Sequence, residues 1–282
     1  MLASAGQTSC GATTHLPDRF LAVDGARLRY RDEGHGPAVL LLHGWTLDLD
    51  MWAPQVAALR GSFRLVRLDR RGFGLSSGRA SLMSDVSDIE SIGRHLRLDH
   101  ISLIGMSQGA RAALQFAANA AIRVACIVLD GPPEMDQDMG AEDDVPIAYY
   151  RELVRTQGIR AFRREWALNP LVQLRTANSG SHELLDAMLE RYSGADLLDA
   201  PDRFGRSPES VPLASIVTPV LVLSGEHDLP ARLNAAIRLA ETLPHAERAV
   251  IPDAGHLPSL DNPDTYNRLT SAFIAHHVAA AS

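Results

Sequence analysis

The chain has 282 residues, of which 46% are hydrophobic and 22% charged, a composition typical of a globular protein large enough for one substantial core. Its formal net charge is −7, which argues against nucleic acid as a partner because phosphate binding needs a basic surface. The longest apolar runs, such as AVLLL and ACIVL, have the length of strands and are far too short to cross a membrane. We therefore expect neither nucleic acid nor a membrane as a partner.

The first 17 residues contain no basic n-region and no apolar h-region, so we interpret residues 1–17 as a flexible N-terminal extension and not as a signal peptide. Of the two cysteines, Cys10 lies in this extension and Cys126 lies in an apolar run. We therefore expect no disulfide framework. Two cysteines of this kind are typical of a reducing compartment, so we expect a cytoplasmic location. A thiol in an apolar strand behaves as a small hydrophobe, so Cys126 is not expected to be a nucleophile.

Strand-like and helical segments alternate after the extension. Residues 20–34 predict a β-hairpin with its turn at Asp24 and Gly25. Further along, the sequence predicts strands at 38–44, 63–69, 101–105 and 123–130, and helices near 51–59, near 85–96 and from residue 107. Runs that are apolar on both faces and separated by helices are typical of a parallel sheet covered on both sides.

The alternation stops between residues 131 and 210, where the chain is polar and helical. It resumes with a strand at 219–225, a helix with Leu233, Ile237 and Ala240 on its apolar face, a strand at 247–252 and a helix from about residue 264. The pattern predicts an α/β fold with a mostly parallel twisted sheet of about eight strands and helices on both faces. We assign residues 18–132 and 211–282 to this core, and residues 133–210 to a helical cap inserted after the sixth strand.

The Gly-x-Ser-x-Gly pattern of a serine nucleophile occurs twice, as GLSSG at 74–78 and as GMSQG at 105–109. Ser107 lies where a predicted strand ends and a helix begins. In that context a sharp turn lifts the hydroxyl away from the sheet, and flanking glycines leave room for it. Ser76 follows DRRGF and no strand. We predict that Ser107 is the nucleophile and that Ser76 shapes a loop.

A serine hydroxyl becomes reactive when a base takes its proton and an acid orients that base. Of the 11 histidines, His256 lies in a loop after the last strand. Asp228 directly follows the strand at 219–225 and should emerge at the same sheet edge as Ser107. The order Ser107, Asp228, His256 is the chain order of a nucleophile-elbow triad. Asp130, at the end of the sixth strand, is the competing acid.

Ester cleavage also needs hydrogen-bond donors for the negative oxygen that develops at the attacked carbonyl. The backbone N–H of Gln108, at the start of the helix after Ser107, is one candidate. The backbone N–H of Trp45 is the other, because Gly44 lets the preceding loop turn inward. His43 is expected to brace this loop.

Five motifs occur in order, and they are HGW at 43–45, DRRGFGLS at 69–76, GMSQG at 105–109, GEHD at 225–228 and GH at 255–256. With them, the chain from about residue 20 onward resembles the α/β-hydrolase superfamily, in its single-cap branch of small esterases, lactonases and cofactor-free haloperoxidase-like enzymes. The resemblance implies cleavage of a carboxylic ester or lactone through an acyl-enzyme, without a cofactor. It also assigns Ser76 to a structural loop of the family.

Individual residues narrow the activities that the resemblance implies. Ser107 stands where haloalkane dehalogenases and epoxide hydrolases of this fold have a carboxylate. Thr46 stands where the haloperoxidase-like group often has proline, so peracid chemistry is not favoured. WALNPL at 166–171 is similar to a cap segment of enol-lactonase-like members and of the lyase that forms a cyclohexadiene intermediate of menaquinone synthesis, and Arg111 follows the nucleophile by four residues as in that lyase.

We expect a small-molecule substrate, with Gly44, Met106, Arg111 and Trp166 as candidate binding residues. The alternative role for Arg111 is a structural ion pair beneath the nucleophile turn. The alternative role for Trp166 is packing within the cap. The acidic run at 134–144 lacks the spacing of a calcium loop, so no metal is predicted. Assembly as a homodimer remains open. A lyase or carbon–carbon bond hydrolase that uses the same triad as a base is the alternative function, and a ligand receptor on this scaffold is a third.

Overall fold

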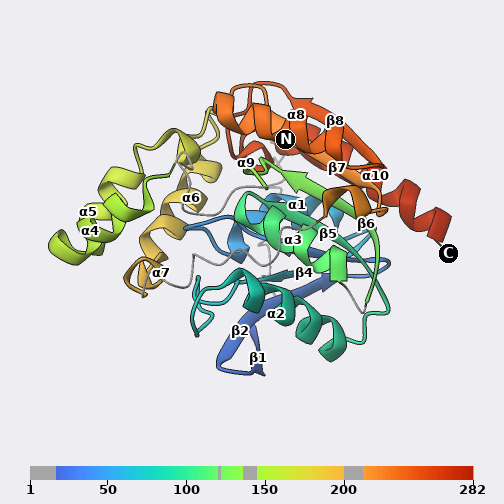
Figure 1. Cartoon of the computed structure of the whole chain (residues 1–282), viewed down its shortest axis with the longest axis horizontal. Coiled ribbons are helices and arrows are strands. Elements are labelled where there is room, and N and C mark those ends of the chain that lie inside the picture. Colours follow the sequence, from blue (N-terminus) through green and yellow to red (C-terminus); the bar gives the residue numbers. More distant parts are fainter. Residues whose placement is uncertain (1–16, 120–121, 136–144, 200–211, 282) are drawn as a thin grey trace, which may run out of the picture.

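The computed structural model describes residues 17–119, 122–135, 145–199 and 212–281 (Figure 1). Eight strands form a single sheet in the order β1-β2-β4-β3-β5-β6-β7-β8. β1 (Arg19–Val23) and β2 (Ala26–Gly34) form the predicted hairpin, and β2 is also antiparallel to β4. The other neighbours are parallel, which confirms the predicted mostly parallel sheet. The extension lies outside the described residues except for its last residue.

The predicted strands are confirmed, with ends that differ by one or two residues. They are β3 (Ala38–Leu42), β4 (Arg64–Leu68), β5 (His100–Met106), β6 (Arg123–Asp130), β7 (Val220–Gly225) and β8 (Ala246–Ile251). β3, β5, β6, β7 and β8 run parallel, so their carboxyl ends meet at one edge of the sheet. The loops that follow these strands carry every residue of the predicted triad.

Helices cover both faces of the sheet. One buried cluster joins the sheet to α2 (Leu82–His95), α3 (Gln108–Asn119) and α8 (Pro230–Thr242). A second cluster joins the other face to α1 (Ala53–Leu59), α9 (Pro258–Asp261) and α10 (Pro263–Ala281). Short 3-10 turns are η1 (Leu49–Trp52) before α1 and η4 (Leu213–Ser215) before β7. None of the helices in the described ranges is both long enough and apolar enough to span a membrane.

The helix α8 is confirmed, and its predicted apolar face is right in part, because Leu233 and Ala240 are half-buried. Ile237 is exposed, whereas Ala235, Ala236 and Leu239 are buried. α8 lies against β7 and β8, and small side chains let the helix approach the sheet closely. The longer isoleucine therefore points outward.

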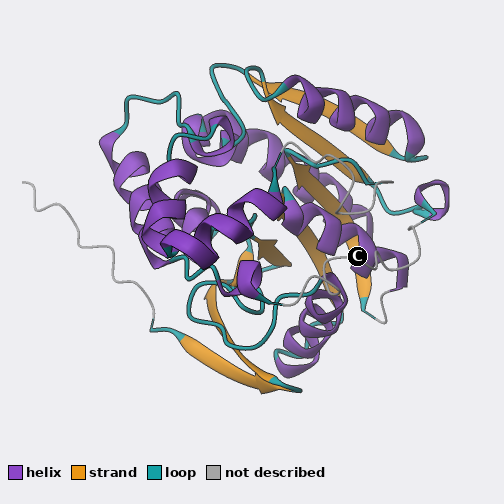
Figure 2. Cartoon of the chain, turned by 60° about the vertical axis from the view of Figure 1, so that its left-hand side comes forward, coloured by secondary structure: helices purple, strands orange, loops and turns teal. Residues whose placement is uncertain are grey.

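Within residues 145–199, the larger part of the predicted cap that the structure describes, the chain forms four helices and a 3-10 turn. They are α4 (Ile147–Gln157), α5 (Ile159–Trp166), η2 (Pro170–Val172), α6 (Ser179–Arg191) and α7 (Ala195–Leu198). Figure 1 shows α4, α5, α6 and α7 on the left, beside the sheet, and Figure 2 turns that side of the molecule toward the viewer. Residues 136–144, with most of the acidic run, and residues 200–211 lie outside the described chain. The proposed boundaries at 133 and 210 stay a prediction.

Candidate active site

Ser107 lies in the predicted strand–turn–helix context, between β5 and α3, with a φ of 51°. A side chain at positive φ is strained, and main-chain contacts hold it there. The Ser107 N–H donates to the Asp130 carbonyl (2.8 Å), and the Ser107 carbonyl accepts from the Ala110 N–H (2.9 Å). A Cβ on Gly105 would collide with the Gly109 carbonyl. The glycine of the motif is therefore needed for the turn to pack against the sheet.

Two other candidate nucleophiles have structural contacts. Ser76 Oγ accepts the Arg29 N–H (2.8 Å) and donates to the Asp69 carbonyl (2.7 Å), so its hydroxyl fastens the loop to β2. Cys126 is fully buried in β6, and burial raises the pKa of its thiol to about 11. A thiol is nucleophilic as the thiolate, which this environment disfavours.

His256 and Asp228 meet at the sheet edge. His256 Nδ1 lies 2.9 Å from Asp228 Oδ2 and 3.1 Å from Oδ1, and both side chains are buried. A carboxylate accepts and does not donate, so this contact places the hydrogen on Nδ1 and leaves the Nε2 lone pair available to take a proton. His256 and Ser107 line the same pocket.

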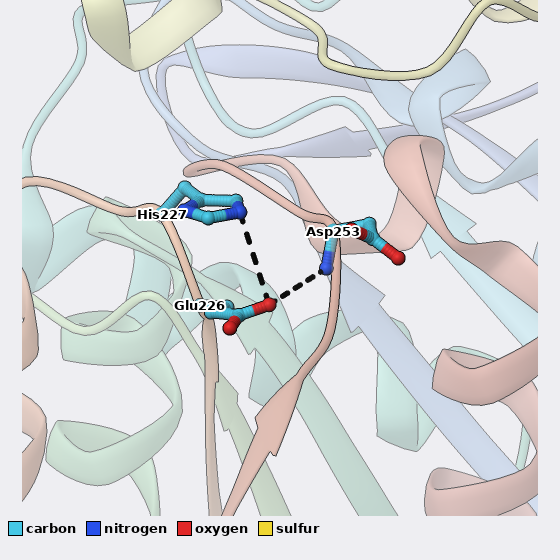
Figure 3. A group of neighbouring side chains, drawn as sticks. All are labelled: Glu226, His227 and Asp253. Atoms are coloured by element: carbon cyan, nitrogen blue, oxygen red, sulfur yellow. Dashed lines mark hydrogen bonds and ion pairs between the residues drawn. The ribbon is translucent and has the colours of Figure 1, made fainter.

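The loops that carry Asp228 and His256 are joined to each other (Figure 3). Glu226 Oε2 accepts the Asp253 N–H (3.1 Å), and the His227 N–H donates to the Ala254 carbonyl (2.8 Å). A Cβ on Gly225 would collide with the Gly255 carbonyl, so the two loops touch through their backbones. These contacts fix the position of the imidazole relative to the carboxylate.

Glu226, His227 and Asp253 also offer ligand atoms that lie within 4.8 Å of one another. All three residues are exposed, and Figure 3 shows Glu226 between the His227 ring and the Asp253 backbone nitrogen. The hydrogen bond from the Asp253 N–H to Glu226 explains why these three side chains lie close together. Exposed acidic groups of this kind need no metal to account for them, and no metal chemistry is assigned to the group.

Asp130, the competing acid, is fully buried at the end of β6. Burial, together with the charge of Asp228, raises the pKa of Asp130 well above its usual range, and the nearby Tyr266 hydroxyl opposes this only in part. Neither Asp130 oxygen accepts a hydrogen bond from a described residue. A neutral carboxylic acid stabilises an imidazolium far less than a carboxylate does. Of the two candidates, only Asp228 contacts the imidazole of His256.

Sequence reasoning missed Gly131, which follows Asp130 with a φ of 52°. A Cβ at this position would lie 2.9 Å from His256 Cε1 and 3.0 Å from Nδ1. Glycine therefore leaves the space that the imidazole occupies. The only signal in the sequence is a glycine directly after a predicted strand.

The loop after β3 is braced by His43, which is fully buried. Its Nδ1 donates to the Gly44 carbonyl (2.7 Å), and its Nε2 accepts the Arg70 N–H (2.8 Å). Burial and the charge of Arg70 lower the pKa of His43 to about 3, so the ring is neutral. A Cβ on Gly44 would lie 2.5 Å from Met106 Sδ, so glycine lets this loop approach the nucleophile turn.

The two backbone amides predicted for the oxyanion flank the nucleophile turn. Trp45 and Gln108 both line the pocket with Ser107. Within the described residues, neither backbone N–H donates a hydrogen bond. Gln108 is also the first residue of α3, and the first amides of a helix favour a negative charge.

The pocket lies between these loops and the cap helices. Predicted residues Met106, Arg111 and Trp166 line it, whereas Gly44 does not. The remaining lining residues are Leu47, Pro133, Val145, Ile147, Leu171, Val172, Arg232 and Leu257, together with the residues of the nucleophile turn, Trp45 and His256. Sequence reasoning did not predict Arg232.

Trp166 combines the two roles that the sequence left open, because it is buried in the cap and lines the pocket. Its Nε1 donates to Thr46 Oγ1 (2.9 Å), and its ring packs edge-on against Trp45 with centroids 4.8 Å apart. Trp45 Nε1 in turn donates to Asp196 Oδ2 in α7 (2.7 Å). The cap is therefore bonded directly to the loop that bears a predicted oxyanion donor.

Thr46 has a φ of 64°, which a proline ring cannot adopt because it holds φ near −65°. The conformation of the loop after Trp45 therefore requires a residue other than proline at position 46, where the haloperoxidase-like group often has proline. A β-branched residue at this φ is strained. The hydrogen bond from Trp166 helps to hold it.

The fold, the family match and relatives named as esterases together show a hydrolase that acts on ester bonds. Residues 37–263 match the alpha/beta hydrolase fold family, and the chain belongs to it. The resemblance seen in the motifs is confirmed.

Relatives in this family have several activities. The chain is 29% identical over 255 residues to a pimeloyl-acyl-carrier-protein methyl ester esterase of Pectobacterium atrosepticum, covering 88% of this chain and 98% of the relative. It is 28% identical over 272 residues to a Bacillus subtilis protein that carries the name 2-succinyl-6-hydroxy-2,4-cyclohexadiene-1-carboxylate synthase, covering 89% and 96%. The enol-lactonase structure from Burkholderia xenovorans LB400 superposes with a TM-score of 0.76 at 25% identity, covering 91% and 100%.

Proposed function

We propose that the chain is a serine hydrolase that cleaves a carboxylic ester or lactone of a small molecule through a Ser107–His256–Asp228 triad and an acyl-enzyme. One observation carries the proposal. The strained Ser107 turn and a histidine that is hydrogen-bonded to a buried carboxylate line the same pocket. The esterase and enol-lactonase relatives support it.

In the proposed mechanism, Ser107 Oγ attacks the substrate carbonyl while His256 Nε2 takes the hydroxyl proton. The backbone N–H groups of Trp45 and Gln108 hold the resulting oxyanion. The intermediate collapses when His256 returns the proton to the leaving alkoxide, which leaves an acyl ester on Ser107. A water molecule, deprotonated by His256, then attacks that ester, and His256 returns the proton to Ser107 Oγ as the acid leaves. Asp228 keeps the imidazole oriented through both steps.

The surroundings support this chemistry in a cytoplasmic enzyme that acts on a small molecule without a cofactor. The cap helices close the pocket with apolar side chains such as Ile147, Leu171 and Val172, which keep bulk water from the acyl-enzyme. The cap also limits the acyl or alcohol group that the pocket accepts.

The test is a rapid-mixing experiment with 4-nitrophenyl acetate. The proposal predicts a burst of nitrophenolate equal to the enzyme concentration and a covalent acetyl group on the peptide that contains Ser107. Ser107→Ala should abolish both signals. Steady turnover without acetylation of any peptide would overturn the acyl-enzyme mechanism.

A lyase or carbon–carbon bond hydrolase that uses the same triad as a base is the second candidate. It is favoured by the Bacillus subtilis relative and by the position of Arg111 in the pocket. In this reading Ser107 and His256 remove a proton from the substrate, and no acyl-enzyme forms. Turnover of a cyclohexadiene precursor without a trapped acyl group would select this candidate.

A further inference from the structure

A buried carboxylate of the cap holds the side chain of Trp45, whose backbone N–H is one of the two proposed oxyanion donors. Asp196 lies in α7 and is 2% exposed, and its Oδ2 accepts the Trp45 Nε1–H (2.7 Å). Its other oxygen, Oδ1, accepts the Tyr192 hydroxyl (2.6 Å). Two short hydrogen bonds to one buried carboxylate are costly to break, so Asp196 ties Trp45 to the cap in a defined position.

Contacts within the cap fix the position of Asp196 itself. Tyr192 ends α6, and its carbonyl accepts two hydrogen bonds from the Arg163 guanidinium of α5 (3.1 and 2.8 Å). Gly194 makes the turn between α6 and α7 with a φ of 71°, which favours glycine. A Cβ on Gly194 would lie 2.6 Å from Ile159 Cδ1, so this turn packs against α5. The carboxylate therefore has a defined place relative to the rest of the cap.

The side chain of Trp45 lies among cap residues, whereas its backbone belongs to the loop after β3. The indole packs edge-on against Phe162 and Tyr192, with centroids 5.7 and 5.9 Å apart, respectively. Apolar contacts of this kind are compatible with several ring orientations, whereas the directional bond from Nε1 to Asp196 selects one. Since the ring and the backbone N–H of Trp45 share one Cα, the orientation of the ring constrains the position of the amide.

Asp196 stands apart from the other cap residues near Ser107. The described residues that line the pocket include Trp45 but not Asp196. A substitution of Asp196 therefore removes no contact with a bound substrate, and its effect on the reaction has to pass through Trp45. That effect is large if the amide moves, because loss of one oxyanion donor costs about 10²- to 10³-fold in rate and a displacement of about 1 Å costs about 10²-fold.

We propose that Asp196 is a positioning residue for the oxyanion site, which sets through Trp45 where the backbone N–H meets the developing oxyanion. This inference rests on the proposed hydrolase function. It makes the rate of the chemical step at the sheet edge depend on a side chain of the cap. The dependence is on kcat and not on substrate affinity, because the amide contacts the oxygen most strongly in the transition state.

The first test measures the hydrolysis of 4-nitrophenyl butyrate by two variants of Asp196. Asp196→Leu has a similar size but no acceptor, and it should lower kcat about 10- to 100-fold while KM changes less than about threefold. Asp196→Asn should keep kcat within about threefold of the wild type, because its Oδ1 accepts from Trp45 and its amide can donate to the Tyr192 oxygen. Glu152→Gln, at an exposed cap carboxylate paired with Arg155, is the control and should leave both constants unchanged.

A pair of inhibitors separates the oxyanion site from the rest of the pocket. With butyl trifluoromethyl ketone, Ser107 Oγ bonds to the carbonyl carbon, its proton passes to His256, and the carbonyl oxygen becomes an oxyanion. The corresponding alcohol has nearly the same shape but forms no oxyanion. In Asp196→Leu the inhibition constant of the ketone should rise by about the factor by which kcat/KM falls, and that of the alcohol should stay within about threefold. A general loss of cap packing would weaken both compounds equally.

Trp45→Phe removes the N–H at the other end of the hydrogen bond and should show the same selective loss of the ketone. Adding Asp196→Leu to Trp45→Phe should lower kcat no further, because the ring no longer has a group for Asp196 to hold. Thermal unfolding identifies misfolded variants, and Trp45→Phe decides the question alone if Asp196→Leu does not fold.

The outcomes distinguish this inference from the proposed function. If the wild type neither hydrolyses the ester nor binds the ketone, the hydrolase proposal is overturned and the positioning role with it. If the wild type does both, the positioning role alone is overturned by any of three results. These are a normal kcat in Asp196→Leu, equal weakening of the ketone and the alcohol, and an undiminished effect of Asp196→Leu in the Trp45→Phe background.

Discussion

The two walls of the pocket are built in different ways. The wall at the sheet edge carries Ser107, Asp228 and His256, and backbone geometry fixes each of them through a positive φ, glycine contacts or bonds between loops. The wall formed by the cap is held by packed aromatic rings and by side-chain hydrogen bonds such as Trp166 to Thr46. Backbone geometry leaves motifs in a sequence, whereas side-chain packing does not. We expect substitutions on the first wall to change the chemistry and on the second to change substrate choice.

The largest effect is expected at the nucleophile turn. Ser107→Ala should lower kcat for 4-nitrophenyl butyrate by at least about 10⁴-fold, because the hydroxyl forms the covalent bond. Ser76→Ala, in the other Gly-x-Ser-x-Gly segment, should keep kcat within about threefold and lower the free energy of unfolding by about 1–3 kcal/mol, because buried hydrogen-bond partners lose their contacts. Initial rates and urea unfolding measure the two effects. The reverse pattern would mean that the wrong serine has been assigned.

Substitution of the two buried carboxyl groups, Asp228 and Asp130, should have effects on kcat that differ nearly as much as those of the two serines. Asp228→Asn should lower kcat by about 10³- to 10⁴-fold, because an amide does not hold the required histidine tautomer. Asp130→Asn replaces a buried carboxyl group, whose pKa is raised by burial and by the charge of Asp228, with an uncharged isostere, and it should lower kcat less than about threefold. The comparison uses the same ester and variants of equal thermal stability. Equal losses in both variants would show that Asp130 also acts on the histidine.

A moderate effect is expected at the cap wall. Trp166→Phe keeps an aromatic ring but removes the hydrogen bond to Thr46. It should change the ratio of kcat/KM between short and long acyl esters by about three- to tenfold and leave kcat for the best ester within about threefold. Tyr149→Phe, at an exposed cap residue that contacts Glu165, is the matched control. A kcat loss in Trp166→Phe as large as that of Asp228→Asn would contradict the division between the walls.

The smallest effect concerns acid stability. The pKa of His43 is about 3 in the folded protein, below its ordinary value of 6.5. Between these two values the unfolded chain therefore binds a proton on His43 that the folded chain does not bind. The stability contributed by neutral His43 should be complete above pH 6.5 and decrease as the pH falls toward 3. Thermal midpoints between these limits should fall less steeply in His43→Gln than in the wild type. Parallel curves would show that His43 is charged in the folded protein.

Patterns in the sequence predicted the sheet, the Ser107 turn and the pairing of His256 with Asp228, because apolar runs and strand ends determine them. The exposed face of α8 could not be predicted, since both Ile237 and the buried alanines fit a helical period. Arg232 was missed for the same reason: its burial depends on how α8 is rotated against the sheet. Asp196 was missed because its hydrogen bond to Trp45 joins residues 151 apart in the chain.

Labelling with a fluorophosphonate, followed by peptide mass mapping, distinguishes the serines in one experiment because the probe reacts only with an activated hydroxyl. The wild type and Ser76→Ala should be labelled on the peptide that contains Ser107, and His256→Ala should react at least about 10³-fold more slowly because its serine lacks a base. Label on another residue, or equal rates with and without His256, would contradict the assignment of Ser107 and His256 as a nucleophile and its base.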